Sequence, residues 1–204
     1  MNQLNSINAR RLSVLAVACT LLAGCDISHR KHDNGDNVRI GTPFGSMHIK
    51  TDNDANIAGL GLSTYPGAVP LKDHDGKDKD AADINLNFGD FHLGVKAASF
   101  QTSDPPDKVE AFYRKDMAHY GEVIECRGDK TVGEPARTSQ GLTCRDNDNG
   151  HHELHVSDDH NNPELRAGSP EHQHIVGIEP KDGGTKIGLV ALDLPGHHDQ
   201  SDSE

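Results

Sequence analysis

Hydrophobic and polar residues alternate over two adjacent stretches near the middle of the chain. Residues 84–88 read Ile-Asn-Leu-Asn-Phe, and residues 91–95 place Phe, Leu and Val at every second position. Alternation of this kind is typical of a strand that buries one face, and the Gly89-Asp90 pair between the two stretches is a turn signal. The pattern predicts a hairpin over residues 84–100, at the start of the protein's core.

A helical repeat of apolar residues occurs over residues 104–120. The members of this repeat, which would form one stripe, are Val109, Phe112, Tyr113, Met117 and Tyr120. Asp104 is placed to cap the helix, Pro105 to occupy its first position and Gly121 to end it. We expect the stripe to pack against a sheet rather than to stack on a ligand.

Short hydrophobic runs predict further strands after the helix. These runs occupy residues 122–126, 141–145, 153–156, 174–179 and 185–192. The link at residues 180–184, Pro-Lys-Asp-Gly-Gly, is the strongest hairpin signal, because glycine adopts positive φ at little cost. Strands in series with a single helix favour an α+β fold, in which a small antiparallel sheet packs against one main helix over about residues 104–120.

Polar stretches divide the rest of the chain. Residues 25–37 are expected to be a disordered spacer, and residues 38–83 to hold a small hairpin and then a mobile acidic loop. The hairpin has too few apolar residues to stand alone, so it must dock on another element or fray. The α+β core domain is expected at residues 84–194, and residues 195–204 are expected to form a disordered His/Asp-rich tail.

The first residues carry an export pattern. Arg10-Arg11 precede an apolar run over residues 12–24, and no acidic residue occurs before Asp26. A cationic start, a short apolar middle and small residues before a cut are typical of a secretory signal peptide. The run is shorter than the roughly 20 apolar residues of a membrane-spanning helix, so residues 1–24 are predicted to be a signal peptide.

The stretch Leu22-Ala23-Gly24-Cys25 resembles the lipobox of bacterial lipoprotein precursors. The resemblance implies cleavage before Cys25, a diacylglycerol on its thiol and usually an acyl chain such as palmitate on its new amine. The mature chain would then be held in the cell envelope by its lipid, facing the periplasm. Asp26 after the cysteine favours the inner membrane slightly over the outer, as in enteric-like bacteria. The alternative is a signal peptide that merely ends in cysteine.

A second resemblance lies in the mature part of the chain. Residues 104–115, together with Tyr65-Pro66-Gly67-Ala68, resemble uncharacterised exported bacterial proteins. This likeness agrees with export and implies no particular chemistry.

Charge and composition narrow the possible partners. Residues 1–24 contain two arginines and no acidic residue, so their removal takes the formal net charge from −12 to −14. Nucleic acid is therefore an unfavourable partner, because phosphate binding needs clustered Lys and Arg. The hydrophobic content of 33%, without any Trp, is low for a fully globular chain and favours one modest domain.

The chain has four cysteines, and two of them would remain free to pair after processing and lipidation. Cys19 leaves with the signal peptide and Cys25 would carry lipid. In an oxidising compartment the natural pairing is a disulfide between Cys126 and Cys144. A redox or metal-binding pair is the alternative, although redox motifs favour Cys-x-x-Cys and zinc sites need several close ligands.

Histidines and carboxylates raise the question of a divalent metal. The densest group is His151, Glu153 and His155, which would share one face of a strand. The stretch is not His-Glu-x-x-His and is not expected to be helical, so a zinc-protease site is excluded. The acidic run at residues 146–150 lacks the glycine and glutamate positions of an EF-hand. No metal cofactor is therefore assigned, and a low-affinity divalent site stays an alternative.

Catalytic motifs are not evident in the sequence. Gly-x-Ser-x-Gly and phosphate-cradling loops are missing, and no carboxylate pair can be singled out among 32 acidic residues. We therefore expect a lipid-anchored envelope protein with a non-catalytic binding or scaffolding domain and an unidentified envelope protein as partner. A His/Asp-rich metal-binding lipoprotein is the first alternative, and a hydrolase of unknown substrate is the second.

Overall fold

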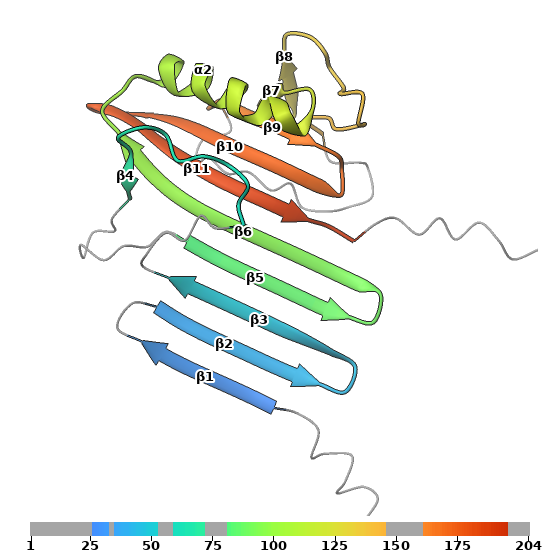
Figure 1. Ribbon diagram of the computed structural model, residues 1–204. Coiled ribbons are helices and arrows are strands. Elements are labelled where there is room, and N and C mark those ends of the chain that lie inside the picture. The colour runs from blue at the N-terminus through green and yellow to red at the C-terminus, as the bar shows by residue number, and fades with distance from the viewer. Residues whose placement is uncertain (1–25, 33–34, 53–58, 72–80, 146–160, 196–204) are drawn as a thin grey trace, which may run out of the picture.

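The structure is a computed structural model that describes residues 26–32, 35–52, 59–71, 81–145 and 161–195 (Figure 1). The strands are β1 (Asp26–His32), β2 (Gly35–Thr42), β3 (Gly45–Asp52), β4 (Val69–Pro70), β5 (Ala81–Phe88), β6 (Phe91–Thr102), β7 (Ile124–Arg127), β8 (Lys130–Val132), β9 (Glu164–Gly168), β10 (His172–Lys181) and β11 (Gly184–Asp193). The helix α2 (Pro106–Met117) continues into a 3-10 turn, η1 (Ala118–Tyr120).

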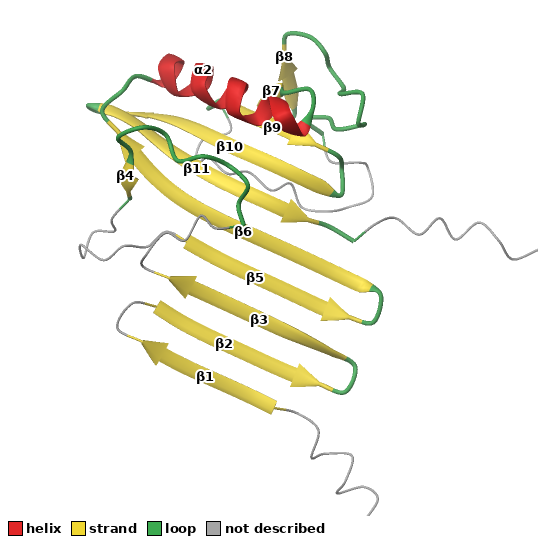
Figure 2. Cartoon of the chain, viewed as in Figure 1, coloured by secondary structure: helices red, strands yellow, loops and turns green. Residues whose placement is uncertain are grey.

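All eleven strands belong to one antiparallel sheet. Its order is β1-β2-β3-β5-β6-β11-β10-β9-β7-β8, and β4 pairs with β6 beside this path. Strands β1, β2 and β3 run up and down as successive hairpins, β5 and β6 form another hairpin, and the hairpin β10–β11 lies between β6 and β9 (Figure 2). The sheet therefore extends as an open ladder away from the part that α2 covers (Figure 1).

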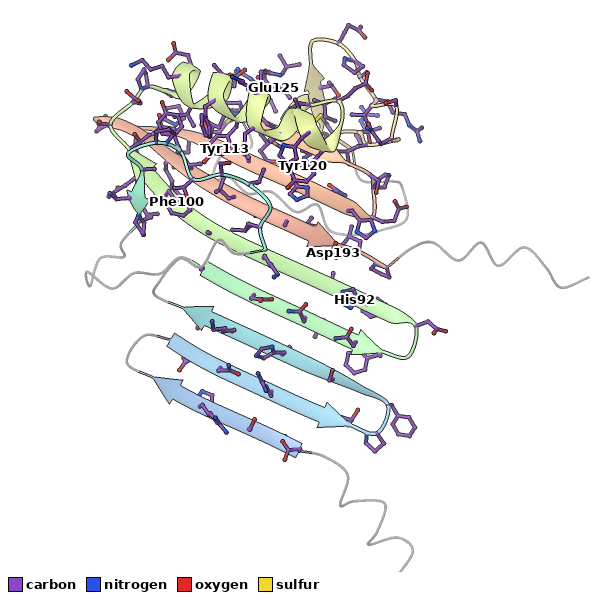
Figure 3. All side chains as sticks on the ribbon, in the orientation of Figure 1. His92, Phe100, Tyr113, Tyr120, Glu125 and Asp193 are labelled. Atoms are coloured by element: carbon purple, nitrogen blue, oxygen red, sulfur yellow. A yellow bond between two sulfur atoms is a disulfide. The ribbon has the colours of Figure 1, made fainter. Side chains whose placement is uncertain are left out.

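The main core lies between α2 and the strands β9, β10 and β11. Val109, Tyr113 and Met117 of α2 are fully buried there. The loop before β4 adds Leu60, Leu62 and Tyr65 to the same cluster. Tyr113 and Phe100 can be followed in Figure 3. Burying each such large apolar side chain stabilises the fold by about 1.5–3 kcal/mol.

The predicted fold class, a small sheet packed against one main helix over about residues 104–120, is wrong. The described part of the chain is mostly strand, and α2 has only 12 residues. The helix covers β9, β10 and β11, whereas β1, β2, β3 and β5 extend beyond it. The sheet grows without a helix because each hairpin satisfies its neighbour's backbone hydrogen bonds.

The start of the helix also differs from the prediction. Pro105 is the N-cap residue and Asp104 makes no capping hydrogen bond. Instead, the Asp104 carboxylate accepts hydrogen bonds from the Tyr65 hydroxyl at 2.8 Å and the Lys108 ammonium at 3.2 Å. These two donors hold the pKa of Asp104 below its usual value. Asp104 thereby ties the loop before β4 to the helix.

The predicted disordered spacer at residues 25–37 is wrong for the residues that the structure describes. Residues 26–32 form β1, which pairs antiparallel with β2 from Asp26 opposite Gly41 to His32 opposite Gly35. The polar composition of these residues did not predict a strand, because β1 is stabilised by backbone hydrogen bonds to β2 and not by burial of its side chains. The predicted hairpin that follows docks on another element of the sheet, through β3 paired with β5.

Two further predicted hairpins are present. The first, over residues 84–100, is β5–β6, and the second, around residues 180–184, is β10–β11. Residues 141–145 form no strand; they belong to a loop joined to β7 by a disulfide. The strand predicted at residues 153–156, the acidic loop at 72–80 and the tail from 196 lie outside the described residues.

Candidate functional site

The two faces of the sheet can be assigned from β6. Ala98 and Phe100 belong to the core beneath α2, whereas Val95 and Ala97 pack in a separate cluster with Ile175 and other residues. Successive side chains of a strand point to opposite faces. The odd-numbered residues of β6 therefore lie on the face that points away from α2, and the strand register extends this assignment across the sheet.

The face that points away from α2 carries two continuous rows of apolar side chains. In the first row, Val38 lies opposite Ile49, Ile49 opposite Ile84, and Ile84 opposite Val95. In the second row, Ile27, Ile40, Met47, Leu86 and Leu93 follow one another from β1 to β6. Directly opposite residues of antiparallel strands have adjacent side chains. We call this surface the apolar face.

The apolar face is not part of the α2 core. Apart from the exposed Ile27, its side chains in β2, β3, β5 and β6 are half-buried. Among the described elements, β1, β2, β3 and β5 make extensive contacts only with neighbouring strands. A contiguous patch of partly exposed apolar side chains is a feature of interaction surfaces.

The opposite face of the same strands is polar. Arg39 lies opposite His48, which lies opposite Asn85. In the next row, the Lys96 ammonium lies 3.8 Å from the Asp83 carboxylate. The side of the sheet that is apolar beneath α2 is thus polar where the sheet leaves the helix. Only this face changes character along the sheet, because the face that points away from α2 is apolar in both parts.

Apolar side chains also gather at one end of the strands. The most exposed large ones there are Phe44 (85%), Ile27 (69%), Phe88 (46%) and Phe91 (43%). Phe44 lies in the β2–β3 turn, and Phe88 and Phe91 flank the β5–β6 turn. The register, with Gly45 opposite Phe88, brings both turns to the same end of the sheet. We call this the phenylalanine end; His92, labelled in Figure 3, lies beside it.

An aromatic stack lies at the end of the helix. Tyr120 of η1 stacks on His174 of β10, with ring centroids 3.6 Å apart and planes at 14°. The His119 ring contacts that of Tyr120 at a tilt of 43°, with centroids 3.9 Å apart. The Tyr120 hydroxyl donates a hydrogen bond to the carbonyl oxygen of Gly61. Burial and the neighbouring His119 lower the pKa of His174. The stack fastens the loop before β4 to β10.

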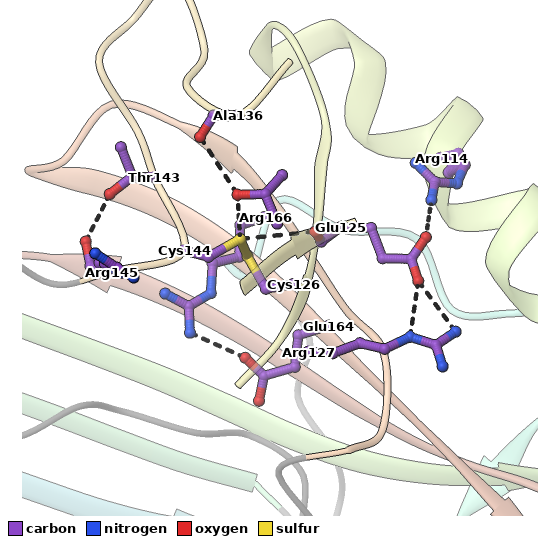
Figure 4. The surroundings of a disulfide bond; sticks show 11 residues. Arg114, Glu125, Cys126, Arg127, Ala136, Thr143, Cys144, Arg145, Glu164 and Arg166 are labelled. Atoms are coloured by element: carbon purple, nitrogen blue, oxygen red, sulfur yellow. Dashed lines mark hydrogen bonds and ion pairs between the residues drawn. A yellow bond between two sulfur atoms is a disulfide. The ribbon is translucent and has the colours of Figure 1, made fainter. Parts of the chain in front are cut away.

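The Cys126–Cys144 disulfide lies beside a group of ion pairs (Figure 4). The Glu125 carboxylate, next to the bridge, pairs with Arg114 of α2 and Arg127 of β7. The bridge closes a small cluster with Ile124 and Leu142. It is consistent with the pairing that cysteine parity predicts, and it fastens the loop after β8 to the sheet.

The remaining predicted site residues lie outside the described part of the chain. These are the lipidation site Cys25 and the metal candidates His151, Glu153 and His155, so each stays a prediction. Within the described ranges, no three His, Cys, Asp or Glu residues are grouped to hold a metal ion. No helix in those ranges is both long and apolar enough to cross a membrane.

Comparison of the chain with protein-family models, curated proteins and solved structures found no match.

The apolar face was not predicted from the sequence. Its signal was the alternation at Val38-Arg39-Ile40 and Met47-His48-Ile49, which repeats that of residues 84–88. Alternation does not give the register between strands, and only the register shows that the apolar residues of five strands form continuous rows.

Proposed function

We propose that this chain is a lipid-anchored protein of the cell envelope whose domain serves as a non-catalytic binding or scaffolding module. The lipobox Leu22-Ala23-Gly24-Cys25 supports attachment to a membrane through Cys25, with the domain facing the periplasm and the inner membrane slightly favoured. The Cys126–Cys144 bridge supports an oxidising compartment, since disulfides persist there and are rare in the cytosol.

The apolar face is the observation that carries the binding role. Five strands at about 4.8 Å spacing and roughly eight residues at about 3.4 Å each give this face an area on the order of 600 Å². A standard protein–protein interface takes about 800 Å² per partner. The size of the face therefore suits a small interface with one protein partner. The proposed partner is an envelope protein with an apolar surface.

The test uses two adjacent residues on opposite faces of β3. Met47 lies on the apolar face and His48 on the polar face. A photocrosslinking amino acid would be placed at either position in the full chain. Each variant would be expressed in a bacterium that has a periplasm. We expect one dominant envelope-protein adduct from position 47, and none from position 48. The adduct should be lost with Ile49→Lys and retained with the matched variant His48→Lys.

Lipid attachment is measured on the same material. We expect the mass of the mature amino terminus to include acyl chains and the protein to fractionate with membranes, and Cys25→Ser to abolish both. Equal crosslinking from the two faces would contradict the binding role. An unacylated amino terminus in the parent protein would contradict the anchor.

A further inference from the structure

The point at which the chain enters the sheet coincides with the phenylalanine end. β1 begins at Asp26, which lies opposite Gly41 at the end of β2. The β2–β3 turn follows directly, and Gly45 after it lies opposite Phe88 at the β5–β6 turn. In Figure 1 the start of β1 and both turns lie on the same side of the sheet.

Attachment at Cys25 leaves almost no distance between this end and a bilayer. A residue spans at most about 3.6 Å of extended chain, and Asp26 directly follows Cys25. Under the proposed function, on which this step rests, acyl chains on Cys25 hold the start of β1 at the level of the lipid headgroups. The phenylalanine end must then face the bilayer, and the strands stand away from it.

The side chains at this end suit the boundary between headgroups and acyl chains. Phe44, Phe88 and Phe91 are three of the five phenylalanines of the chain. The other two pack in or against the core, Phe100 within it and Phe112 at its margin. Aromatic and aliphatic side chains bury favourably in the interfacial layer of a membrane. The exposed aromatic residues thus gather at the one end that the anchor would bring to lipid.

We infer that the phenylalanine end is a membrane-contacting edge, in which Phe44, Phe88 and Phe91 enter the bilayer surface beside the lipid anchor. The contact is apolar rather than electrostatic, because the nearby charges include the carboxylates of Asp26 and Asp90 and the chain is acidic. Zwitterionic lipid therefore suffices, and salt does not weaken the contact. The apolar face then stands upright from the membrane, open to a partner in the same envelope.

The test uses the fact that the chain contains no Trp, so one introduced Trp reports from its own position. The reporter is Phe44→Trp, at an 85% exposed turn residue that tolerates substitution. The matched control is Val69→Trp, which is 52% exposed in β4 and lies at the opposite end of β6, opposite Gln101. Both full-length mature lipoproteins are reconstituted in vesicles of phosphatidylcholine and phosphatidylethanolamine, with and without brominated acyl chains.

We expect brominated lipid to quench the fluorescence of the Phe44→Trp protein several-fold more than that of the Val69→Trp protein, with bluer emission and no change at high salt. Equal, weak quenching in an acylated, vesicle-bound protein would overturn the membrane contact and leave the proposed anchor intact. Blue-shifted emission without quenching, in a protein of doubled mass, would overturn it in favour of a second copy. A mature protein without acyl chains would contradict the proposed anchor, and would also contradict the membrane contact that rests on it.

Discussion

Ile49 of β3 and Ile84 of β5 lie directly opposite each other on the face of the sheet that points away from α2. Val38 and Val95 continue the row on either side. Among the described elements, α2 makes no extensive contact with β2, β3 or β5, whereas β6 also contributes Ala98 and Phe100 to the core beneath the helix. Most of this apolar row therefore lies outside the core, in the part of the sheet that we propose for binding.

The first prediction compares an isoleucine of the apolar face with one of the core. Ile187→Ala, at a fully buried position opposite Phe100, should lower the free energy of unfolding by about 2–5 kcal/mol. Ile84→Ala should cost only about 1 kcal/mol, because the side chain is half-exposed and acts mainly through cross-strand pairs. Denaturant unfolding of the two variants measures the difference, and equal losses would show that the apolar face is packed like a core.

The second prediction concerns the protonation of His174. The pKa of His174 lies below its usual 6.5 because of burial and the nearby His119, which Asp193 opposes in part. The folded protein then binds fewer protons at this site than the unfolded chain. The free energy of unfolding should therefore fall as pH drops through about 6.5 and level off below the folded-state pKa.

The variant His174→Gln tests this dependence. It should reduce the loss of stability between neutral and mildly acidic pH, as measured by denaturant unfolding in each buffer. At pH well above 6.5, the parent His174 is neutral, so the comparison there isolates the stacking contact with Tyr120. An unchanged pH dependence in the variant would show that His174 is not the group responsible.

The third prediction concerns the Cys126–Cys144 disulfide. The two cysteines are 18 residues apart, and closing a loop of this length stabilises a protein by about 3 kcal/mol through its unfolded state. Reduction, or the double variant Cys126→Ala and Cys144→Ala, should lower the free energy of unfolding by about that amount. Cys25 is left unchanged in the parent and in the variant, so that the expected lipid attachment is the same in both. Two reactive thiols in the unreduced mature protein would contradict the bridge.

The fourth prediction compares two neighbouring glycines of the β10–β11 turn. A Cβ at Gly184 would overlap the backbone oxygen of Thr102, whereas nothing lies within 4 Å of one at Gly183. Gly184→Ala should therefore cost about 1–3 kcal/mol by overpacking. Gly183→Ala should cost about 1–2 kcal/mol, through its positive φ of 84° alone. Thermal and denaturant unfolding of the two variants measure the difference, and a smaller loss for Gly184→Ala than for Gly183→Ala would contradict the overlap with Thr102.

Local patterns were sufficient to predict the elements whose residues are themselves distinctive. The alternation at residues 84–100 predicted β5–β6, and the Asp-Gly-Gly link predicted the β10–β11 hairpin. The apolar stripe from Val109 to Tyr120 predicted a helix over residues 104–120, whereas α2 begins at Pro106 and the last predicted turn is the 3-10 turn η1. In each case the periodicity or the turn residues act within a few positions, so the element can be predicted without knowledge of the rest of the fold.

The polar strands could not be predicted in this way. β1 contains only one apolar residue, Ile27, and owes its place to backbone pairing with β2. The loop at residues 141–145 has a strand-like composition, yet its Cys144 is held by Cys126 outside the ladder. Backbone hydrogen bonds to β2 place residues 26–32 in the sheet, and the disulfide to Cys126 holds residues 141–145 outside it.

By itself, the amino-acid sequence determined the acidic charge and the alternation of apolar and polar residues within β2, β3, β5 and β6, and it predicted an anchor at Cys25. Only the tertiary structure decided that Val38, Ile49, Ile84 and Val95 form one row, and that Phe44 and Phe88 meet at the end where β1 begins. The physical reason is that alternation fixes which side chains share a face within a strand. Register between strands, set by backbone pairing, fixes which of those faces join.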